Sequence, residues 1–300
     1  MALVLNLGAT VANRRAAPPT RWFSRLDGSQ ELSSPRVNDA TGTTFRCRPY
    51  RRIVSLVPSL TQTLFDLGLG DRIVGVTEYC VLPQEAQDSP RELVGGTKNP
   101  DVAKIRSLEP DLVVVNQEEN SLKKVRQIQR FAPTFVTYPR TVEGAVEMMQ
   151  DLASLTQVGE EAVKAVLGPV RRLVNELVVN PSPHPKCYYT PVWRSPWVTF
   201  NDQTYAADFL TLVGGWNLFG SATASYPRIT LDEVPKDQLD VILLPDEPYH
   251  FTQVDVVDLR EEGFGDVPIQ LVDGKFHWYS PTQLLKLLPT FTKLFQNLSG

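Results

Sequence analysis

Carboxylates that follow apolar runs are the first residues in this sequence that could do chemistry. Glu118 and Glu119 come soon after one such run, and Asp246 and Glu247 come after another. Acids gathered in this way can bind a metal ion or a cationic ligand, because carboxylate oxygens are hard, charged ligands. Solvated acids on a surface loop are the more common case. The pattern therefore offers a candidate ligand site and identifies no particular metal.

The histidines do not complete a catalytic or zinc site. His184, His250 and His277 show neither the HExxH spacing nor any other two-histidine helix pair. No GxGxxG follows a predicted strand, and neither a GxxxxGK[ST] phosphate loop nor a GxSxG nucleophile turn occurs. Among the histidines, only His277, next to Trp278, is expected near a ligand. We therefore predict no catalytic residues and no enzyme, and the alternative that stays open is an enzyme whose site leaves no signature in the sequence.

Aromatic rings form the second candidate set. Four of the five tryptophans lie in the second half of the chain, and Trp193, Trp197, Tyr226 and Trp278 fall on predicted loops or strand ends. Such rings suit a flat, partly apolar ligand because they bury a large area at a low cost in entropy. Packing beneath the loops of their own lobe is an equally open interpretation.

Composition limits the class of protein. The chain has 300 residues, 42% of them hydrophobic, and a net charge of -4, which argues against neutralising a nucleic-acid backbone. Its three cysteines, Cys47, Cys80 and Cys187, form no CxxC pair and are expected to be buried thiols. No run of roughly 18 apolar residues occurs, so we expect neither a spanning helix nor an integral membrane protein. A monomer is expected.

Short apolar runs alternate with helical periodicity from Arg51 onward, which is the pattern of an α/β protein. In the first half the expected strands are 53–57, 72–76, 111–115 and 134–138, and the expected helices are 59–68, 101–108 and 121–131. In the second half the expected strands are 186–192, 197–200, 240–244 and 269–272, and the expected helices are 204–213, 254–261 and 281–296.

A long helical stretch joins the two halves, from Val142 to about Leu177, because its apolar residues recur at helical spacing. A break is expected at residues 157–159. The second helix should kink at Gly168 and Pro169, because proline removes one backbone hydrogen bond and crowds the preceding turn.

The two halves resemble each other. Residues 59–75 align without gaps to 204–220, and residues 108–118 resemble 237–247, with Glu118 opposite Glu247. Matches in the same order on either side of a helical connector predict two similar lobes. In open α/β sheets, ligands collect outside the carboxyl ends of the strands, so the loops after the strands should line a cleft between the lobes.

We predict a ligand-binding set drawn from these loops in both lobes. Its members are Pro58, Ser59, Tyr79, Thr97, Lys98, Asn116, Glu118, Trp193, Trp197, Tyr226, Glu247, His277 and Trp278.

Four segments carry a family resemblance. They are "RRIVSLVPSLTQTLFDLGLGDRIVGVTEYC" from residue 51, "VGGTKNPDVAKIRSLEPDLVVVNQEEN" from 94, "VWRSPWVTFNDQTYAADFLTLVGGWN" from 192 and "YPRITLDEVPKDQLDVILLPDEPY" from 226. Together they resemble the helical-backbone metal receptor superfamily of binding proteins for cobalamin and ferric siderophores, nearest to the cobalamin branch. The resemblance covers residues 36 to 295. It implies an α/β fold of two Rossmann-like lobes joined by a long backbone helix, the class III substrate-binding-protein architecture, with residues 159–178 as the bridge.

The resemblance also implies roles for ligand-binding residues. Tyr79 matches an aromatic residue after the second strand, Tyr226 matches a tryptophan that packs on the corrin, and Trp278 belongs to the late aromatic cluster of the family. Thr97 and Asn116 stand where the cobalamin site has two tryptophans.

Transporter docking in the family uses one carboxylate in each lobe. Asp232 matches the carboxylate of the second lobe, with Glu233 beside it. Ala103 stands at the position in the first lobe, which leaves Asp101 as a displaced substitute.

The resemblance and the patterns together divide the chain into four parts. These are a disordered or targeting leader at 1–35, an N-terminal lobe at 36–141, a helical connector at 142–180 and a C-terminal lobe at 181–300. The leader is rich in arginine and shows no recognisable secretory signal, because its charges follow the apolar start. The family location is the periplasm, and a cytoplasmic or organellar location is the alternative.

Two hypotheses of function follow. The first is a substrate-binding protein without an intrinsic cofactor, which captures cobalamin or a related metal chelate between the lobes for an ABC transporter permease. The second is a cytosolic or organellar metal-handling protein or enzyme on the same fold, with a metal held by Glu118, Glu247 and His277.

Overall fold

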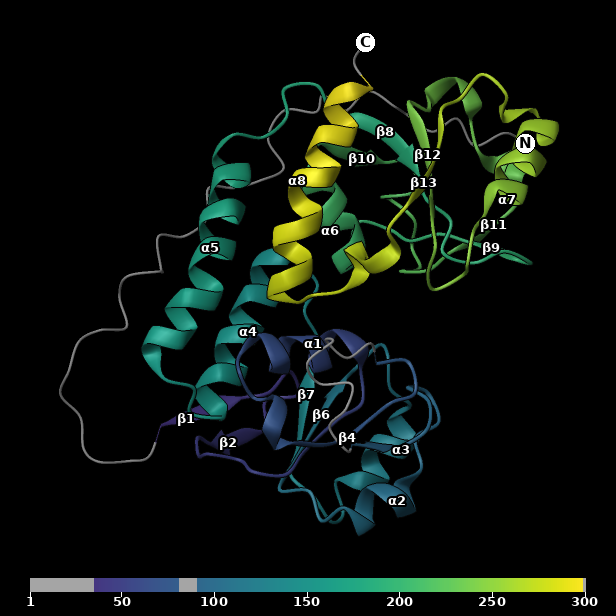
Figure 1. Cartoon of the computed structure of the whole chain (residues 1–300). Coiled ribbons are helices and arrows are strands. Elements are labelled where there is room, and N and C mark those ends of the chain that lie inside the picture. The colour runs from purple at the N-terminus through teal and green to yellow at the C-terminus, as the bar shows by residue number, and fades with distance from the viewer. Residues whose placement is uncertain (1–34, 81–90, 299–300) are drawn as a thin grey trace. The chain divides into compact units, whose positions relative to one another are not determined.

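The computed structural model describes residues 35–80 and 91–298, which form two α/β lobes (Figure 1). The predicted leader, apart from Pro35, lies outside the described residues. The first lobe is built on a five-stranded sheet in which all strands are parallel. Its strands in spatial order are β5 (Glu92–Leu93), β4 (Ile73–Val76), β3 (Ile53–Ser55), β6 (Leu112–Asn116) and β7 (Thr134–Thr137).

Alternation along these strands explains how helices cover both faces of the first sheet. Val54 and Val113 pack with residues of α2 (Val102–Ser107) and α3 (Leu122–Ile128). Their neighbours Ile53 and Leu112 point to the other face and pack with α1 (Pro58–Asp66) and α4 (Val142–Leu155). A sheet buried on both faces needs continuous apolar strands, which is what the sequence provides.

The second lobe repeats this plan on a four-stranded parallel sheet. Its strands in spatial order are β10 (Gly215–Asn217), β8 (Lys186–Tyr189), β12 (Val241–Pro245) and β13 (Ile269–Val272). Helices α6 (Tyr205–Leu212) and α8 (Pro281–Asn297) pack on one face, and α7 (Gln253–Leu259) packs on the other. The two lobes and their connector share one continuous apolar core.

The internal repeat has a structural counterpart. The offset that aligns 108–118 with 237–247 places β6 on β12 without a shift. Asp111, before β6, accepts hydrogen bonds from the backbone N–H groups of Arg51 and Arg52 at 2.9 and 2.8 Å. Asp240, before β12, accepts one from the N–H of Cys187 at 2.7 Å. The paired aspartates therefore link the starts of neighbouring strands, β6 to β3 in the first lobe and β12 to β8 in the second.

The connector consists of α4 and α5 (Glu160–Val179), with the expected break between them. Helix α5 starts beside the first lobe and leads into β8, so it is the backbone helix (Figure 1). Its apolar face is regular, because Val163, Leu167, Val170 and Val174 are buried at helical spacing. The helix runs through Pro169 as a single element. The packing of this apolar face accounts for the continuity, and the kink expected at Gly168 and Pro169 remains a prediction.

Several elements differ from the expectation. A hairpin of β1 (Arg36–Asn38) and β2 (Thr44–Arg46) precedes the first lobe, and β5 and β10 are edge strands too short to show a pattern. The strand expected at 197–200 is not part of the second sheet. It is β9 (Trp197–Val198), which pairs with β11 (Arg228–Ile229) in a separate antiparallel ladder.

The described residues include all three cysteines. Cys47 and Cys187 are buried, Cys80 is half-buried, and all three thiols are free. In residues 35–80 and 91–298, no helix is both long and apolar enough to cross a membrane. The boundaries proposed for the four parts of the chain remain predictions.

Candidate functional site

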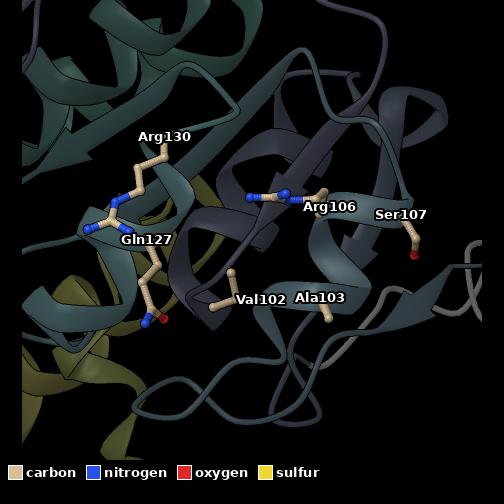
Figure 2. Close-up of a pocket in the computed structure, with 6 residues that line it drawn as sticks. All are labelled: Val102, Ala103, Arg106, Ser107, Gln127 and Arg130. Carbon is tan, nitrogen blue, oxygen red and sulfur yellow. The ribbon is translucent and has the colours of Figure 1, made fainter.

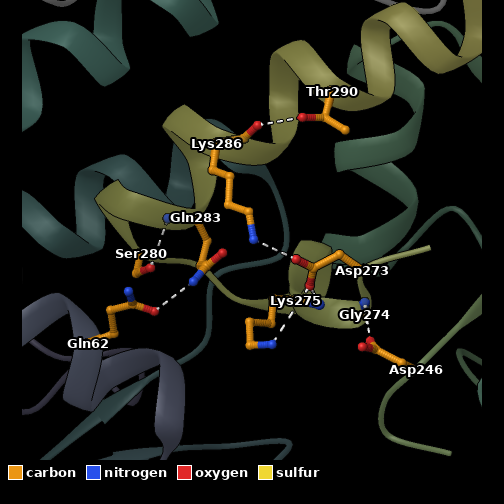
Figure 3. A network of polar contacts seen from close by, with 9 residues as sticks. All are labelled: Gln62, Asp246, Asp273, Gly274, Lys275, Ser280, Gln283, Lys286 and Thr290. Atoms are coloured by element: carbon orange, nitrogen blue, oxygen red, sulfur yellow. Dashed lines mark hydrogen bonds and ion pairs between the residues drawn. The ribbon is translucent and has the colours of Figure 1, made fainter. Parts of the chain in front are cut away.

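The lobes meet through a set of direct hydrogen bonds. Thr282, in the first turn of α8, donates from its N–H and its hydroxyl to the Asp66 carboxylate of α1, at 3.0 and 2.8 Å. One turn earlier on α1, the Thr63 hydroxyl donates to the carbonyl oxygen of Tyr279 at 3.1 Å. The Gln283 amide donates to Gln62 at 3.0 Å, as Figure 3 shows. These bonds fix the loop around Tyr279 against the first lobe.

Tyr226 of the second lobe faces carboxylates of the first lobe. It precedes β11, and 46% of its surface is exposed. Burial nevertheless raises its pKa, and the charges of Glu118 and Glu119 raise it further. A side chain that is surrounded by protein and still accessible to solvent is expected where two lobes face each other across a concave surface.

Tyr279 lies deeper at the same junction. Its side chain is buried, and its hydroxyl lies close to the hydroxyls of Ser59 and Thr137. Burial raises the pKa of Tyr279, and Glu119 and Glu118 act in the same direction. The phenol is therefore neutral at physiological pH and available as a hydrogen-bond donor.

Tyr138 also raises the pKa of Tyr226. We give the name interlobe site to the residues of both lobes that influence one another here, which are Ser59, Glu118, Glu119, Thr137, Tyr138, Tyr226 and Tyr279. The first-lobe members follow β6, end or follow β7, or begin α1, at the carboxyl ends of the strands. That edge is where the sequence predicted a ligand.

The electrostatics of the interlobe site centre on Glu118. Burial raises its pKa, the neighbouring Glu119 raises it too, and Arg140 and Lys98 lower it. The Lys98 ammonium donates a hydrogen bond to the Glu118 carbonyl oxygen. Arg140 reaches across the lobes and donates to the carbonyl and side-chain oxygens of Gln203 at 2.8 and 3.0 Å. The carboxylates and phenol groups of the interlobe site therefore lie beside two cations, Lys98 and Arg140.

Asn116 and Asn120 hold the Glu118 loop in shape. The Asn116 side-chain oxygen accepts from the N–H groups of Glu118 and Glu119 at 2.8 and 3.1 Å. Asn120 accepts from the N–H of Asn116 at 2.8 Å and donates to the carbonyl oxygen of Thr97 at 2.9 Å. Both Asn116 and Thr97 are buried. In this structure these two predicted ligand contacts build the loop that presents Glu118.

The second lobe presents Glu247, His277 and Trp278 as a group. Burial raises the pKa of Glu247, whereas Lys275 and a hydrogen bond from the Trp278 indole lower it. His277 ends a short helical turn (Gly274–His277), and its ring lies between Phe200 and Phe276, with centroids 5.9 and 4.1 Å away. Burial lowers the pKa of His277 to about 3. The imidazole is therefore neutral and packed as part of the core.

A polar network fixes the turn that carries His277 (Figure 3). Asp246 accepts a hydrogen bond from the N–H of Gly274 at 2.7 Å, and Asp273 accepts one from the N–H of Lys275 at 3.0 Å. The Lys286 ammonium of α8 pairs with Asp273 at 2.8 Å. Asp246, the neighbour of Glu247 in the sequence, therefore has a structural role, because it holds the turn at Gly274 in place.

Gly274 allows the turn to lie against Glu247. A Cβ added at Gly274 would lie 2.6 Å from the Glu247 carbonyl oxygen and 2.7 Å from its nitrogen. Because the backbone there cannot move away freely, Gly274→Ala should lower the free energy of unfolding by about 1–3 kcal/mol. Urea unfolding of the variant measures this. Gly265→Ala is the matched control, since a Cβ there meets nothing within 4 Å, and an equal loss in both variants would contradict the prediction.

The other predicted aromatic residues occupy a separate cluster. Trp197 stacks on Phe251 with centroids 6.1 Å apart, and Trp193 meets Tyr249 edge-on at 5.5 Å. Trp193 is 47% exposed. The ligand roles of Trp193 and Trp197 remain predictions, and so do those of Pro58, which begins α1, and of the exposed Tyr79.

The predicted docking acids lie on the surface, and two of them cap helical turns. Asp101 caps α2 by accepting hydrogen bonds from the N–H groups of Ala103 and Lys104, both at 3.0 Å. Glu233 closes a capping box with Thr230. Asp232 is exposed on the same turn. Their docking roles remain predictions.

The second hypothesis placed a metal ion between Glu118, Glu247 and His277, and this prediction is wrong. Within the described residues, no group of three or more histidine, cysteine or acidic side chains is close enough to bind a metal ion. The His277 ring instead packs against the Phe200 and Phe276 rings. Spacing along the sequence could not reveal this packing.

Sequence reasoning missed Thr137, Tyr138, Arg140 and Gln203. Thr137 ends β7, and Tyr138 and Arg140 follow it, at the same sheet edge as the carboxyl end of β6. The loop after this predicted strand was not included in the candidate set, although the rule applied to the other strands covers it. Gln203 carries no such signal, because its role depends on the position of Arg140 in the other lobe.

A hollow of about 560 Å³ lies elsewhere, between α2 and α3 on the face of the first lobe that these helices cover (Figure 2). None of its lining residues belongs to the interlobe site or to the predicted ligand set.

Comparisons with known proteins agree with this architecture. A family model described as periplasmic binding protein matches residues 53–255. The vitamin B12-binding protein of Vibrio campbellii is 26% identical over 196 residues, which cover 65% of this chain and 70% of that protein.

Solved structures show the same fold. The periplasmic vitamin B12 binding protein of Vibrio cholerae aligns with a TM-score of 0.66 and 20% identity, covering 83% of this chain and 99% of that one. The periplasmic heme binding protein of Vibrio cholerae aligns with a TM-score of 0.68 and 18% identity, covering 81% of this chain and 98% of that one.

Proposed function

The chain belongs to the periplasmic binding protein family, and on this basis we propose that its interlobe site captures cobalamin or a related metal chelate. A role in substrate binding follows from the family and from the relatives, which are binding proteins and not enzymes. Family membership also implies a periplasmic location. The ligand is bound cargo and not an intrinsic cofactor.

One observation carries the proposal. Tyr226 and Tyr279 of the second lobe share an electrostatic environment with Glu118 and Glu119 of the first. An accessible ring opposite polar groups offers a flat, partly apolar ligand both a stacking surface and hydrogen-bond partners. Vitamin B12 and heme, the ligands named for the relatives, are both metal-bearing macrocycles.

The test is a direct titration. Cobalamin, cobinamide, heme and a ferric siderophore are added to the purified protein, and ligand absorbance and tryptophan fluorescence are followed. We expect one of them to bind with a Kd of about 1 μM or below, a free energy near 8 kcal/mol in magnitude. No change with any of them at about 10 μM, which would nearly saturate such a site, would remove the proposal.

Tyr226→Ala should weaken binding of that ligand by about tenfold or more, because a central aromatic contact commonly contributes more than about 1.4 kcal/mol. Tyr226→Phe separates the ring from the hydroxyl and should retain most of the affinity if stacking dominates. Trp216→Ala is the control, since Trp216 is 43% exposed on the edge strand β10. Equal Kd values for wild type and Tyr226→Ala would contradict a role for this ring.

We further propose that the loaded protein delivers its ligand to an ABC transporter permease. The family supports this step, and Asp101, Asp232 and Glu233 are the candidate docking acids. Uptake of radiolabelled cobalamin by cells that lack their own binding protein, with and without this chain supplied, measures delivery separately from capture.

A further inference from the structure

The face formed by α2 and α3 is strongly basic in an acidic protein. Residues 102–107 and 122–130 contain six lysines and arginines and no acid, whereas the whole chain has a net charge of -4. The six are Lys104, Arg106, Lys123, Lys124, Arg126 and Arg130. A local excess of this size attracts anions through the field that it creates.

Two of these cations, Arg106 and Arg130, border one hollow, and part of its lining is apolar. The hollow of about 560 Å³ is bounded by Val102, Ala103, Arg106 and Ser107 of α2 and by Gln127 and Arg130 of the α3 segment. Figure 2 shows Arg106 extending from α2 towards the side lined by Gln127 and Arg130. Arg106, Gln127 and Arg130 therefore border the same hollow, whose lining is mostly apolar.

The arginines of the hollow have no carboxylate to neutralise them. In the part of the chain that the structure describes, neither Arg106 nor Arg130 forms an ion pair, whereas the neighbouring Lys104 pairs with Glu92 at 2.8 Å. The Arg106 guanidinium stacks over the Phe131 ring at 4.7 Å. Stacking restricts the guanidinium but leaves its N–H edge available for an oxyanion.

We propose that the α2–α3 hollow binds a phosphate group. Two guanidinium charges match the charge of a phosphate monoester, which is roughly -2 near neutral pH. Guanidinium groups bind phosphate oxygens in pairs, with planar geometry that ammonium groups lack. Val102 and Ala103 provide an apolar surface for the carbon group attached to the phosphate. The phosphate comes either from a small soluble molecule or from a phospholipid headgroup, and the experiment separates these sources.

The proposal is tested with inorganic phosphate as the free ligand. Phosphate is titrated at constant ionic strength into protein labelled with ¹⁵N, and the side-chain N–H signals of arginine are followed. We expect saturable shifts at Arg106 and Arg130. The double variant Arg106→Gln/Arg130→Gln should bind phosphate at least tenfold more weakly. The control is the double variant Lys123→Gln/Lys124→Gln, which removes the same charge outside the hollow. Its affinity for phosphate should change less than twofold.

Vesicles provide the second arm. Phosphatidylcholine vesicles with and without phosphatidic acid are floated with the same three proteins. Flotation that requires phosphatidic acid and both arginines identifies the headgroup as the source, and phosphate binding without flotation identifies a soluble ligand. Both results support phosphate binding in the α2–α3 hollow.

Two outcomes overturn the proposal. One is the absence of both saturable phosphate shifts and flotation in the wild-type protein. The other is an equal loss of phosphate affinity in the arginine and lysine variants, which would show that binding depends on the overall positive charge of the face and not on the hollow. Circular dichroism checks that each variant is folded. If the double arginine variant is not, Arg130→Gln alone replaces it, because Arg130 is exposed.

Discussion

Phe276→Ala should lower the free energy of unfolding by about 3–5 kcal/mol, the usual cost of deleting a fully buried aromatic ring. Phe276 is 1% exposed and lies against Phe209, Phe291 and His277, with ring centroids 5.9, 5.3 and 4.1 Å away. The surrounding rings would lose their contacts with Phe276, so the cavity would cost both burial and packing. Urea unfolding followed by circular dichroism measures the change.

The control for Phe276→Ala is Leu285→Ala on α8. Leu285 is 39% exposed, so its removal should cost less than about 1 kcal/mol. A loss below about 1 kcal/mol for Phe276→Ala would show that the core collapses around the missing ring. The same variant should also admit water to His277, which would weaken the effect of burial on the pKa of this imidazole.

Acid should destabilise the protein through His277. The ordinary histidine pKa of 6.5 is lowered by burial to about 3 in the folded chain, so the folded state resists a proton that the unfolded state accepts. The stability contributed by the neutral ring is complete above pH 6.5 and is lost as pH falls from 6.5 towards 3. The slope approaches about 1.4 kcal/mol per pH unit, which amounts to roughly 2–3 kcal/mol at pH 4.5.

His277→Phe isolates this effect from the other titrating groups. A phenylalanine ring can pack between Phe200 and Phe276 and takes no proton, and both proteins retain Glu118 and Glu247, whose raised pKa values act in the opposite direction. Urea unfolding of both proteins at pH 7 and 4.5 gives the difference. Parallel losses in the two proteins would show that His277 has an ordinary pKa in the folded state.

Much of the fold could be predicted because its signals are local. The strand expected at 240–244 is β12 at Val241–Pro245, and the helix expected at 281–296 is α8 at Pro281–Asn297. Both segments are long enough for periodicity to appear. Edge strands such as β5 and β10 have only two or three residues, and pairing with a neighbour defines them. Pairing is not visible in a short sequence window.

The sequence predicted candidate residues at the carboxyl ends of strands, and their ligand roles remain predictions. In the structure Glu118 influences Tyr226 across the lobes, and Ser59 lies close to Tyr279. The ligand roles of Thr97 and Asn116 remain predictions, and the hydrogen bonds that these residues form within the Glu118 loop were not anticipated. Arg140 was missed because its partner, Gln203, lies in the other lobe.

The sequence by itself determined the α/β class, the repeat of two lobes and the backbone helix, because each is encoded in apolar spacing along short stretches of chain. Only the tertiary structure decided which side chains share an environment. It enclosed His277 between Phe200 and Phe276 and set Tyr226 opposite Glu118. It also placed Arg106 and Arg130 around one hollow. The reason is physical: burial and charge interactions depend on distances between elements far apart in the chain, and these distances exist only after the lobes have packed.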